Sequence, residues 1–138
     1  MELNEYQQKA MTTCTESSRN VPYMHLNLGA EYQELSEKLN YEEWATTSKF
    51  NDFVEKNYSD AGLVAKAIRK NEIPCPIVPK FSEEELEGIK GELGDVLWQL
   101  SGLCSVLGFT LEDIAQGNLD KLASRKERGV IVGNGDNR

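Results

Sequence analysis

The sequence predicts an all-α fold, an antiparallel helical bundle formed by one domain over residues 1–138. Two observations carry this prediction. Apolar residues recur at three- and four-residue intervals through the longest segments, which is the pattern of one face of a helix. No segment alternates apolar and polar residues convincingly, as a half-buried strand would.

The first two helices are separated by a polar break. A short helix is expected from Leu3 to about Cys14, with Tyr6 and Ala10 facing inward. The run TESSRNVP then interrupts it, because polar residues and Pro22 favour a loop. A second helix is expected from about Tyr23 to Leu39.

Residues 40–81 form an inserted connection between the second helix and the next long one. It contains one short amphipathic helix, SDAGLVAKAIRK, with Ser59 or Asp60 as its cap. The following IPCPIVP holds three prolines, which exclude regular helix and predict an extended surface segment.

Two capped helices complete the chain. Ser82 with Glu85 forms a capping box at the start of a helix that Gly108 ends. Thr110 with Asp113 forms a second box, and Gly129 ends that helix before a tail over 129–138.

Composition and charge restrict the possible partners. Charged residues make up 28% of the chain and the net charge is −8, so nucleic acid and anionic membranes are disfavoured partners. Residues 121–138 nevertheless carry +3, from five basic and two acidic side chains, which leaves −11 elsewhere. The three cysteines form no CxxC pair and the N-terminus shows no apolar signal core, so a cytoplasmic protein with reduced thiols is expected.

Two pairs of acids lie on the flanks of apolar helix faces. Glu92 and Asp95 border the apolar stripe of the helix that begins near residue 82. Glu31 and Glu34 occupy the matching flank of the second helix. If these two helices pack antiparallel, the four carboxylates face one cleft between them.

Four converging carboxylates repel one another and are stabilised by a hard cation. Oxygen donors without His or Cys suit Mg²⁺, with Mn²⁺ also possible. His25 is the only histidine and does not follow an acid at the Glu-x-x-His spacing, so a di-iron centre is disfavoured. The alternative, four solvated acids on helix flanks, stays open on these grounds.

Three segments of the chain resemble the MazG-like family of all-α nucleoside triphosphate pyrophosphohydrolases. These are LGAEYQELSEK, KGELGDVLWQLSGL and LEDIAQGNLDKLASRKERGVIVGNGDNR. The family signature is an ExxE pair followed by an ExxD pair, here Glu31/Glu34 and Glu92/Asp95. The connection over 40–81 is longer than the common family spacing, which leaves the substrate open.

The resemblance implies Mg²⁺-dependent cleavage of a nucleoside triphosphate to a monophosphate and pyrophosphate, in a homodimer or homotetramer that completes the active cleft. It implies that the four acids bind metal and that Glu34 or Glu31 orients the attacking water. Asn118, Lys121 and Arg125 match a family run that binds phosphates, and Lys38 is a further candidate. The alternatives are a related pyrophosphohydrolase of phosphoribosyl-ATP or an alarmone, and a helical oligomerisation module without catalysis.

Overall fold

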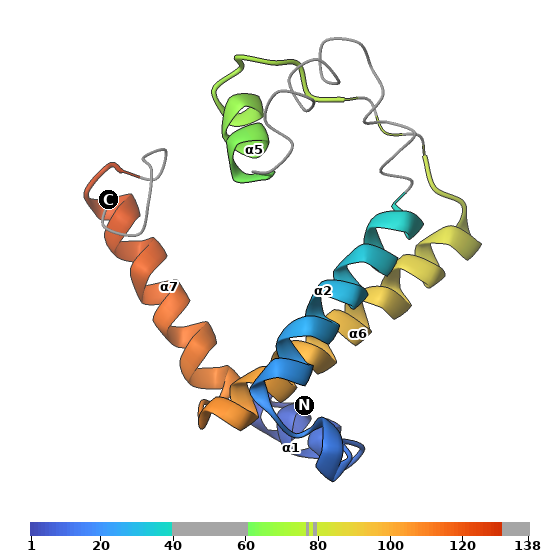
Figure 1. Ribbon diagram of the computed structural model, residues 1–138. Helices are drawn as coiled ribbons and strands as arrows, with labels where there is room; N and C mark the ends of the chain where they lie inside the picture. The colour runs from blue at the N-terminus through green and yellow to red at the C-terminus, as the bar shows by residue number, and fades with distance from the viewer. Residues whose placement is uncertain (40–60, 77, 79, 131–138) are drawn as a thin grey trace. The chain divides into compact units, whose positions relative to one another are not determined.

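All regular structure in the described residues is helical. The computed structural model describes residues 1–39, 61–76, 78 and 80–130. Its α-helices are α1 (Leu3–Met11), α2 (Val21–Lys38), α5 (Ala61–Arg69), α6 (Glu83–Leu107) and α7 (Leu111–Glu127), with a 3-10 turn, η1, at Glu16–Ser18 (Figure 1). The all-α prediction is confirmed.

The first helix is shorter than its sequence predicted. α1 ends at Met11, because the hydroxyl groups of Thr12 and Thr13 donate to the carbonyl oxygens of Lys9 and Ala10, each at 2.7 Å. These bonds satisfy carbonyls that a longer helix would bond through its own backbone.

The second helix begins earlier than predicted, at Val21, and contains Pro22 in its first turn. The side-chain oxygen of Asn20 accepts a hydrogen bond from the Tyr23 backbone N–H at 2.9 Å, so Asn20 caps the helix. A proline in the first turn costs little, since the N–H that it lacks has no partner within the helix. Pro22 therefore belongs to the helix rather than to the preceding break.

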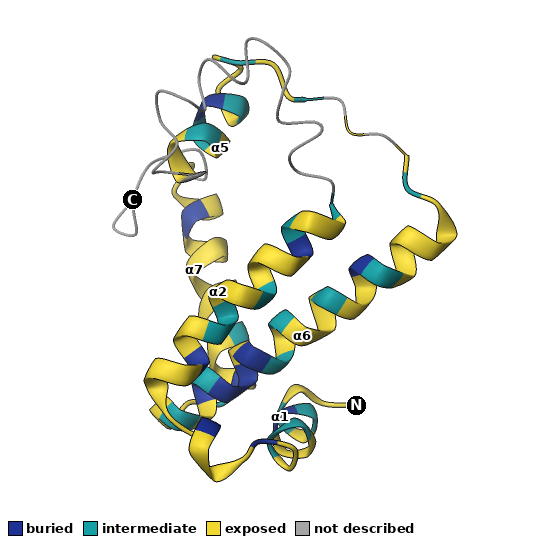
Figure 2. Cartoon of the chain, turned by 45° about the vertical axis from the view of Figure 1, so that its right-hand side comes forward, coloured by how far each residue is buried: buried dark blue, intermediate teal, exposed yellow. Residues whose placement is uncertain are grey.

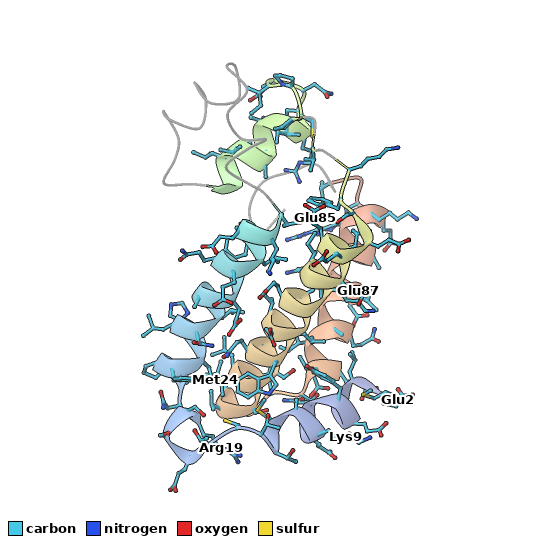
Figure 3. The ribbon with its side chains drawn as sticks, turned by 90° about the vertical axis from the view of Figure 1, so that its right-hand side faces the viewer. Glu2, Lys9, Arg19, Met24, Glu85 and Glu87 are labelled. Carbon is cyan, nitrogen blue, oxygen red and sulfur yellow. The ribbon has the colours of Figure 1, made fainter. Side chains whose placement is uncertain are left out.

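The predicted capping box at Ser82 contains both reciprocal hydrogen bonds, and at α7 the predicted Thr110 cap contains one. Ser82 N donates to Glu85 Oε2 at 2.7 Å, and Glu85 N donates to Ser82 Oγ at 3.2 Å. Figure 3 labels Glu85 at the start of α6. At α7, Asp113 N donates to Thr110 Oγ1 at 3.1 Å. The Ser82 backbone N–H, which donates to the Glu85 carboxylate, lowers the pKa of that carboxyl most, and the Ser82 hydroxyl lowers it further.

The predicted terminating glycines adopt the left-handed conformation that ends a helix. Gly108 has φ 78° and follows α6, and Gly129 has φ 68° and lies two residues after α7. Beyond Gly108, the backbone N–H of Phe109 donates to Cys104 O at 2.8 Å, which closes the end of α6.

The chain forms two compact units, and α2 and α6 each contribute to both. The first unit comprises Met1–Ala30 and Asp95–Arg138, and the second comprises Glu31–Gly94. In the first unit the fully buried Met24 (labelled in Figure 3) lies against Gly102, and in the second the side chain of Lys38 lies over Gly88. Each contact joins one end of α2 to the opposite end of α6, so these helices run antiparallel.

Only part of the apolar stripe on α6 is buried. Ile89 and Cys104 are buried, at 8% and 5% exposure. Five leucines of the same stripe are exposed in the single chain (Figure 2): Leu86, Leu93, Leu97, Leu100 and Leu107. The apolar periodicity correctly predicted this helix, but it did not show which residues of the stripe another helix of the same chain would cover.

None of the helices in the described part of the chain has both the length and the apolar character that crossing a bilayer requires.

Candidate functional site

Three of the four predicted acids come together in the second unit. One carboxylate oxygen each from Glu31, Glu34 and Glu92 can be chosen so that all three lie within 4.8 Å of one another. Glu31 and Glu92 are half-buried and Glu34 is exposed. The group therefore has one solvent-facing member and two that the helices partly enclose.

Helix geometry explains why these acids meet. Glu31 and Glu34 are one turn apart on α2 and therefore share a face. Lys38 lies one turn after Glu34, and its side chain lies over Gly88, one turn before Glu92. Because the helices are antiparallel, stepping one turn back on α2 and one turn forward on α6 brings Glu34 level with Glu92.

The donor set of this cluster fits a divalent metal ion. Two unit charges at 4.8 Å repel by about 1 kcal/mol even at the dielectric constant of water, and three such pairs act here. A bound cation converts this repulsion into attraction. Carboxylate oxygens suit Mg²⁺ or Mn²⁺, whereas zinc sites usually include His or Cys.

Asp95, the fourth predicted acid, lies one turn after Glu92 on α6 and is exposed. It is not one of the three clustered residues, and it belongs to the first unit. In that unit it lies near the half-buried Tyr6 of α1: burial raises the pKa of the Tyr6 phenol, and the negative charge of Asp95 raises it further. The role of Asp95 as a metal ligand stays a prediction based on its position on α6.

The predicted phosphate-binding residues lie in both units. Lys38 is exposed and, through its position over Gly88, lies in the same unit as the three acids. Asn118 and Lys121 are exposed on α7, in the first unit. Arg125, also on α7, is only 5% exposed, which the sequence did not predict for a residue of a basic, solvated helix end.

The spacing argument missed one polar residue on the acidic flank of α6. Gln99 lies four residues after Asp95, so it continues the line of Glu92 and Asp95. It is 3% exposed, and its Oε1 has no hydrogen-bond partner among the described residues. The i+4 spacing from Asp95 was a signal in the sequence, but only the structure shows that this amide is buried.

α1 also contributes more than the sequence suggested. The indole Nε1 of Trp98 on α6 donates to Ala10 O at 3.1 Å and to Thr13 Oγ1 at 3.0 Å. These bonds attach α1 to α6 one turn away from Asp95. No pattern in residues 3–11 indicated that α1 lies so close to a predicted site residue.

Sequence comparisons identify a family and a relative that this chain resembles. Residues 23–130 match the family model of the MazG nucleotide pyrophosphohydrolase domain. The chain is similar to the Gene 37 protein of Mycobacterium phage L5, with 47% identity over 79 residues, which cover 57% of this chain and 68% of that protein. No solved structure matches significantly. With its helical architecture and with a family match over most of its length, the chain belongs to the MazG nucleotide pyrophosphohydrolase family.

Proposed function

We propose that this protein hydrolyses nucleoside triphosphates to monophosphate and pyrophosphate in a Mg²⁺-dependent reaction. Water supplies the oxygen that joins the α-phosphorus, the bond from that phosphorus to the bridging oxygen breaks, and one proton is released. The observation that carries the proposal is the convergence of Glu31, Glu34 and Glu92 in a chain of this family.

Glu31, Glu34 and Glu92 would hold the metal ion, with Asp95 as a fourth ligand from the next turn of α6. When bound, Mg²⁺ supplies charge neutralisation for phosphate oxygens and lowers the pKa of water. Phosphoryl transfer depends on such positioning and electrostatics more than on a covalent nucleophile.

Proton transfer and phosphate binding would depend on side chains of this chain. Glu34 is the exposed member of the cluster, so its carboxylate is accessible to accept a proton from the attacking water, with Glu31 as the neighbouring candidate. Lys38 lies on α2 one turn after Glu34, with its side chain over Gly88 of α6, so its ammonium group would pair with phosphate oxygens beside the acid cluster. Asn118, Lys121 and Arg125 would contact phosphates from α7.

The decisive experiment compares Glu34→Gln with Glu37→Gln. Both remove one negative charge from α2, but only Glu34 belongs to the cluster. We expect Glu34→Gln to lower pyrophosphate release from a panel of NTPs and dNTPs by roughly 10²- to 10⁴-fold, and Glu37→Gln to leave it nearly unchanged. Near-wild-type turnover by Glu34→Gln would reject the assignment.

A metal-binding measurement separates catalysis from structure. Saturating Mg²⁺ should raise the melting temperature of the wild-type protein, because a ligand that binds the folded state stabilises it. Saturating Mg²⁺ should raise the melting temperature of Glu34→Gln much less. A helical oligomerisation module without catalysis would show no Mg²⁺ effect and no pyrophosphate release. A pyrophosphohydrolase of phosphoribosyl-ATP or an alarmone would show the Mg²⁺ effect but release pyrophosphate only from those nucleotides.

We further propose that the protein forms a homo-oligomer through α6. The exposed leucines of α6 recur at seven-, four- and three-residue intervals, so they lie along one face of the helix. Leu93 and Leu97 are 52% and 37% exposed in the single chain. Leu97→Glu should dissociate the oligomer in light scattering, whereas Leu26→Glu, on α2, should not. A monomeric wild-type protein would contradict the proposal.

A further inference from the structure

A pocket of about 410 Å³ lies within the first unit, and none of the clustered acids lines it. One wall is a single face of α1, on which Asn4, Gln8 and Met11 recur at four- and three-residue intervals. The volume is within the range of small-molecule sites in proteins. The family match begins at residue 23, so the α1 wall of this pocket lies outside the matched region.

Gln7 holds the α1 wall in place. Its buried side chain donates to Ser105 Oγ at 2.9 Å and to Phe109 O at 3.0 Å, and it accepts from Leu111 N at 2.8 Å. These three bonds join α1 to the junction of α6 with α7, which also lines the pocket. The pocket is therefore preformed, and both side-chain N–H groups of Gln7 are already used.

The N-terminus of α7 borders the pocket at Thr110, but its donors are already bonded. The backbone N–H groups of the first three residues of α7 donate to side-chain oxygens of Gln7, Asn4 and Thr110. An anion in the pocket would find no free N–H group at these three residues. Its binding therefore depends on a side-chain cation.

Arg19 supplies that cation and is the only charged residue among the described residues that line the pocket. Its Nη2 donates to Met11 O at 3.1 Å and to Cys14 O at 3.4 Å, which fixes the guanidinium (Arg19 is labelled in Figure 3). Within the described part of the chain, Nη1 and Nε have no hydrogen-bond partner and no acid forms an ion pair with Arg19. The guanidinium is held in position while two of its nitrogens keep donors for an anion.

Met11 and Phe109 give the same pocket an apolar part. Met11 is half-buried, and Phe109 is 51% exposed in the single chain. The amide of Gln8 is exposed and has no hydrogen-bond partner among the described residues, so it can bond a polar group of a ligand. An apolar or aromatic body with one anionic group matches this combination, because a guanidinium binds carboxylate and phosphate oxygens alike.

We propose that this pocket binds a small organic anion, with its carboxylate or phosphate group on Arg19 and its apolar body against Met11 and Phe109. The site is additional to the one proposed for hydrolysis. Binding in it should not require Mg²⁺, because none of the described residues that line the pocket is an acid.

The test titrates four probes into the full chain in EDTA and follows the amide signals by two-dimensional NMR. Naphthoate and naphthyl phosphate share one ring system and differ in the anionic group, so the tighter of the two identifies a carboxylate or a phosphate ligand. Naphthalenemethanol carries the ring without the charge, and inorganic phosphate carries the charge without the ring. We expect an aromatic anion to shift the side-chain amide signals of Gln7 and Gln8 and to bind roughly 10- to 150-fold more tightly than naphthalenemethanol.

Arg19→Gln should weaken binding of the preferred anion by a similar factor of roughly 10- to 150-fold. The matched control is Lys9→Gln, which also removes one positive charge, but from a residue that pairs with Glu5 at 2.6 Å and does not line the pocket. Lys9→Gln should leave the anion affinity unchanged. If Arg19→Gln fails to fold, Gln8→Glu replaces it, since a negative charge at this exposed wall residue repels the anion without affecting the neutral probe.

The outcomes test this site independently of the proposed hydrolysis. Unchanged anion affinity in a folded Arg19→Gln or Gln8→Glu variant overturns the assignment. A wild-type protein that binds neither aromatic anion, or that binds naphthalenemethanol equally well, also overturns it. Glu34→Gln should bind the anion as the wild type does, because Glu34 does not line the pocket, whereas its effect on pyrophosphate release bears only on the proposed function.

Discussion

Gln7 offers a sharp test of how α1 is held to the rest of the first unit. Its carboxamide is 8% exposed and joins α1 to Ser105, Phe109 and Leu111 through three hydrogen bonds of 2.8–3.0 Å. The substitution Gln7→Ala removes all three bonds. It also leaves the backbone N–H of Leu111, a residue that is 4% exposed, without its side-chain acceptor.

The expected loss follows from the number of bonds. Each hydrogen bond contributes about 0.5–1.5 kcal/mol, so three contribute about 3 kcal/mol to the free energy of unfolding. For a chain of 138 residues, the unfolding entropy converts each kcal/mol into a change of about 3 °C in melting temperature. Gln7→Ala should therefore lower the melting temperature by about 10 °C.

The assay is thermal unfolding followed by far-UV circular dichroism, with Gln8→Ala as the matched control. Gln8 is the next residue of α1 and is exposed, so its substitution should change the melting temperature by only about 1–2 °C. A decrease for Gln7→Ala no larger than that of Gln8→Ala would refute the reasoning.

Three further changes test packing, electrostatics and phosphate binding. Gly102→Ala places a Cβ 2.6 Å from Cε of the fully buried Met24, so it should destabilise the fold by about 1–3 kcal/mol in urea unfolding, and adding Met24→Val should recover part of that loss. Glu85→Gln should lower the melting temperature at pH 7, and the difference from wild type should vanish as the pH falls well below 4.5. The sign follows because a carboxyl with a lowered folded-state pKa stabilises the fold only while ionised, so equal melting temperatures at pH 7 would contradict the prediction. Lys121→Ala should raise the KM for the nucleotide more than it lowers kcat in steady-state assays, and unchanged values of both would remove Lys121 from the site.

Local sequence signals correctly predict the helices and most of their ends. Helix ends depend on residues that are close together in the sequence, such as the caps Ser82 and Thr110 and the terminating Gly108. Their effect can therefore be predicted without knowledge of the fold. The acid pairs were predictable for the same reason, since residues three apart on a helix must share a face. The predicted end of α1 and the predicted start of α2 were wrong. α1 ends at Met11, where the Thr12 hydroxyl bonds a backbone carbonyl, and α2 begins at Val21, where Asn20 caps the helix.

Which of these helix faces meet depends on packing between segments that are distant in the sequence. The contact of Lys38 with Gly88 sets the register that brings Glu34 level with Glu92, and no local pattern specifies it. The attachment of α1 depends on Gln7 and Trp98, whose partners lie 85 or more residues away in the sequence. Periodicity in the sequence indicates that a helix has an apolar or acidic face. What that face contacts is determined by packing between distant segments, because burial and hydrogen bonding depend on proximity in space.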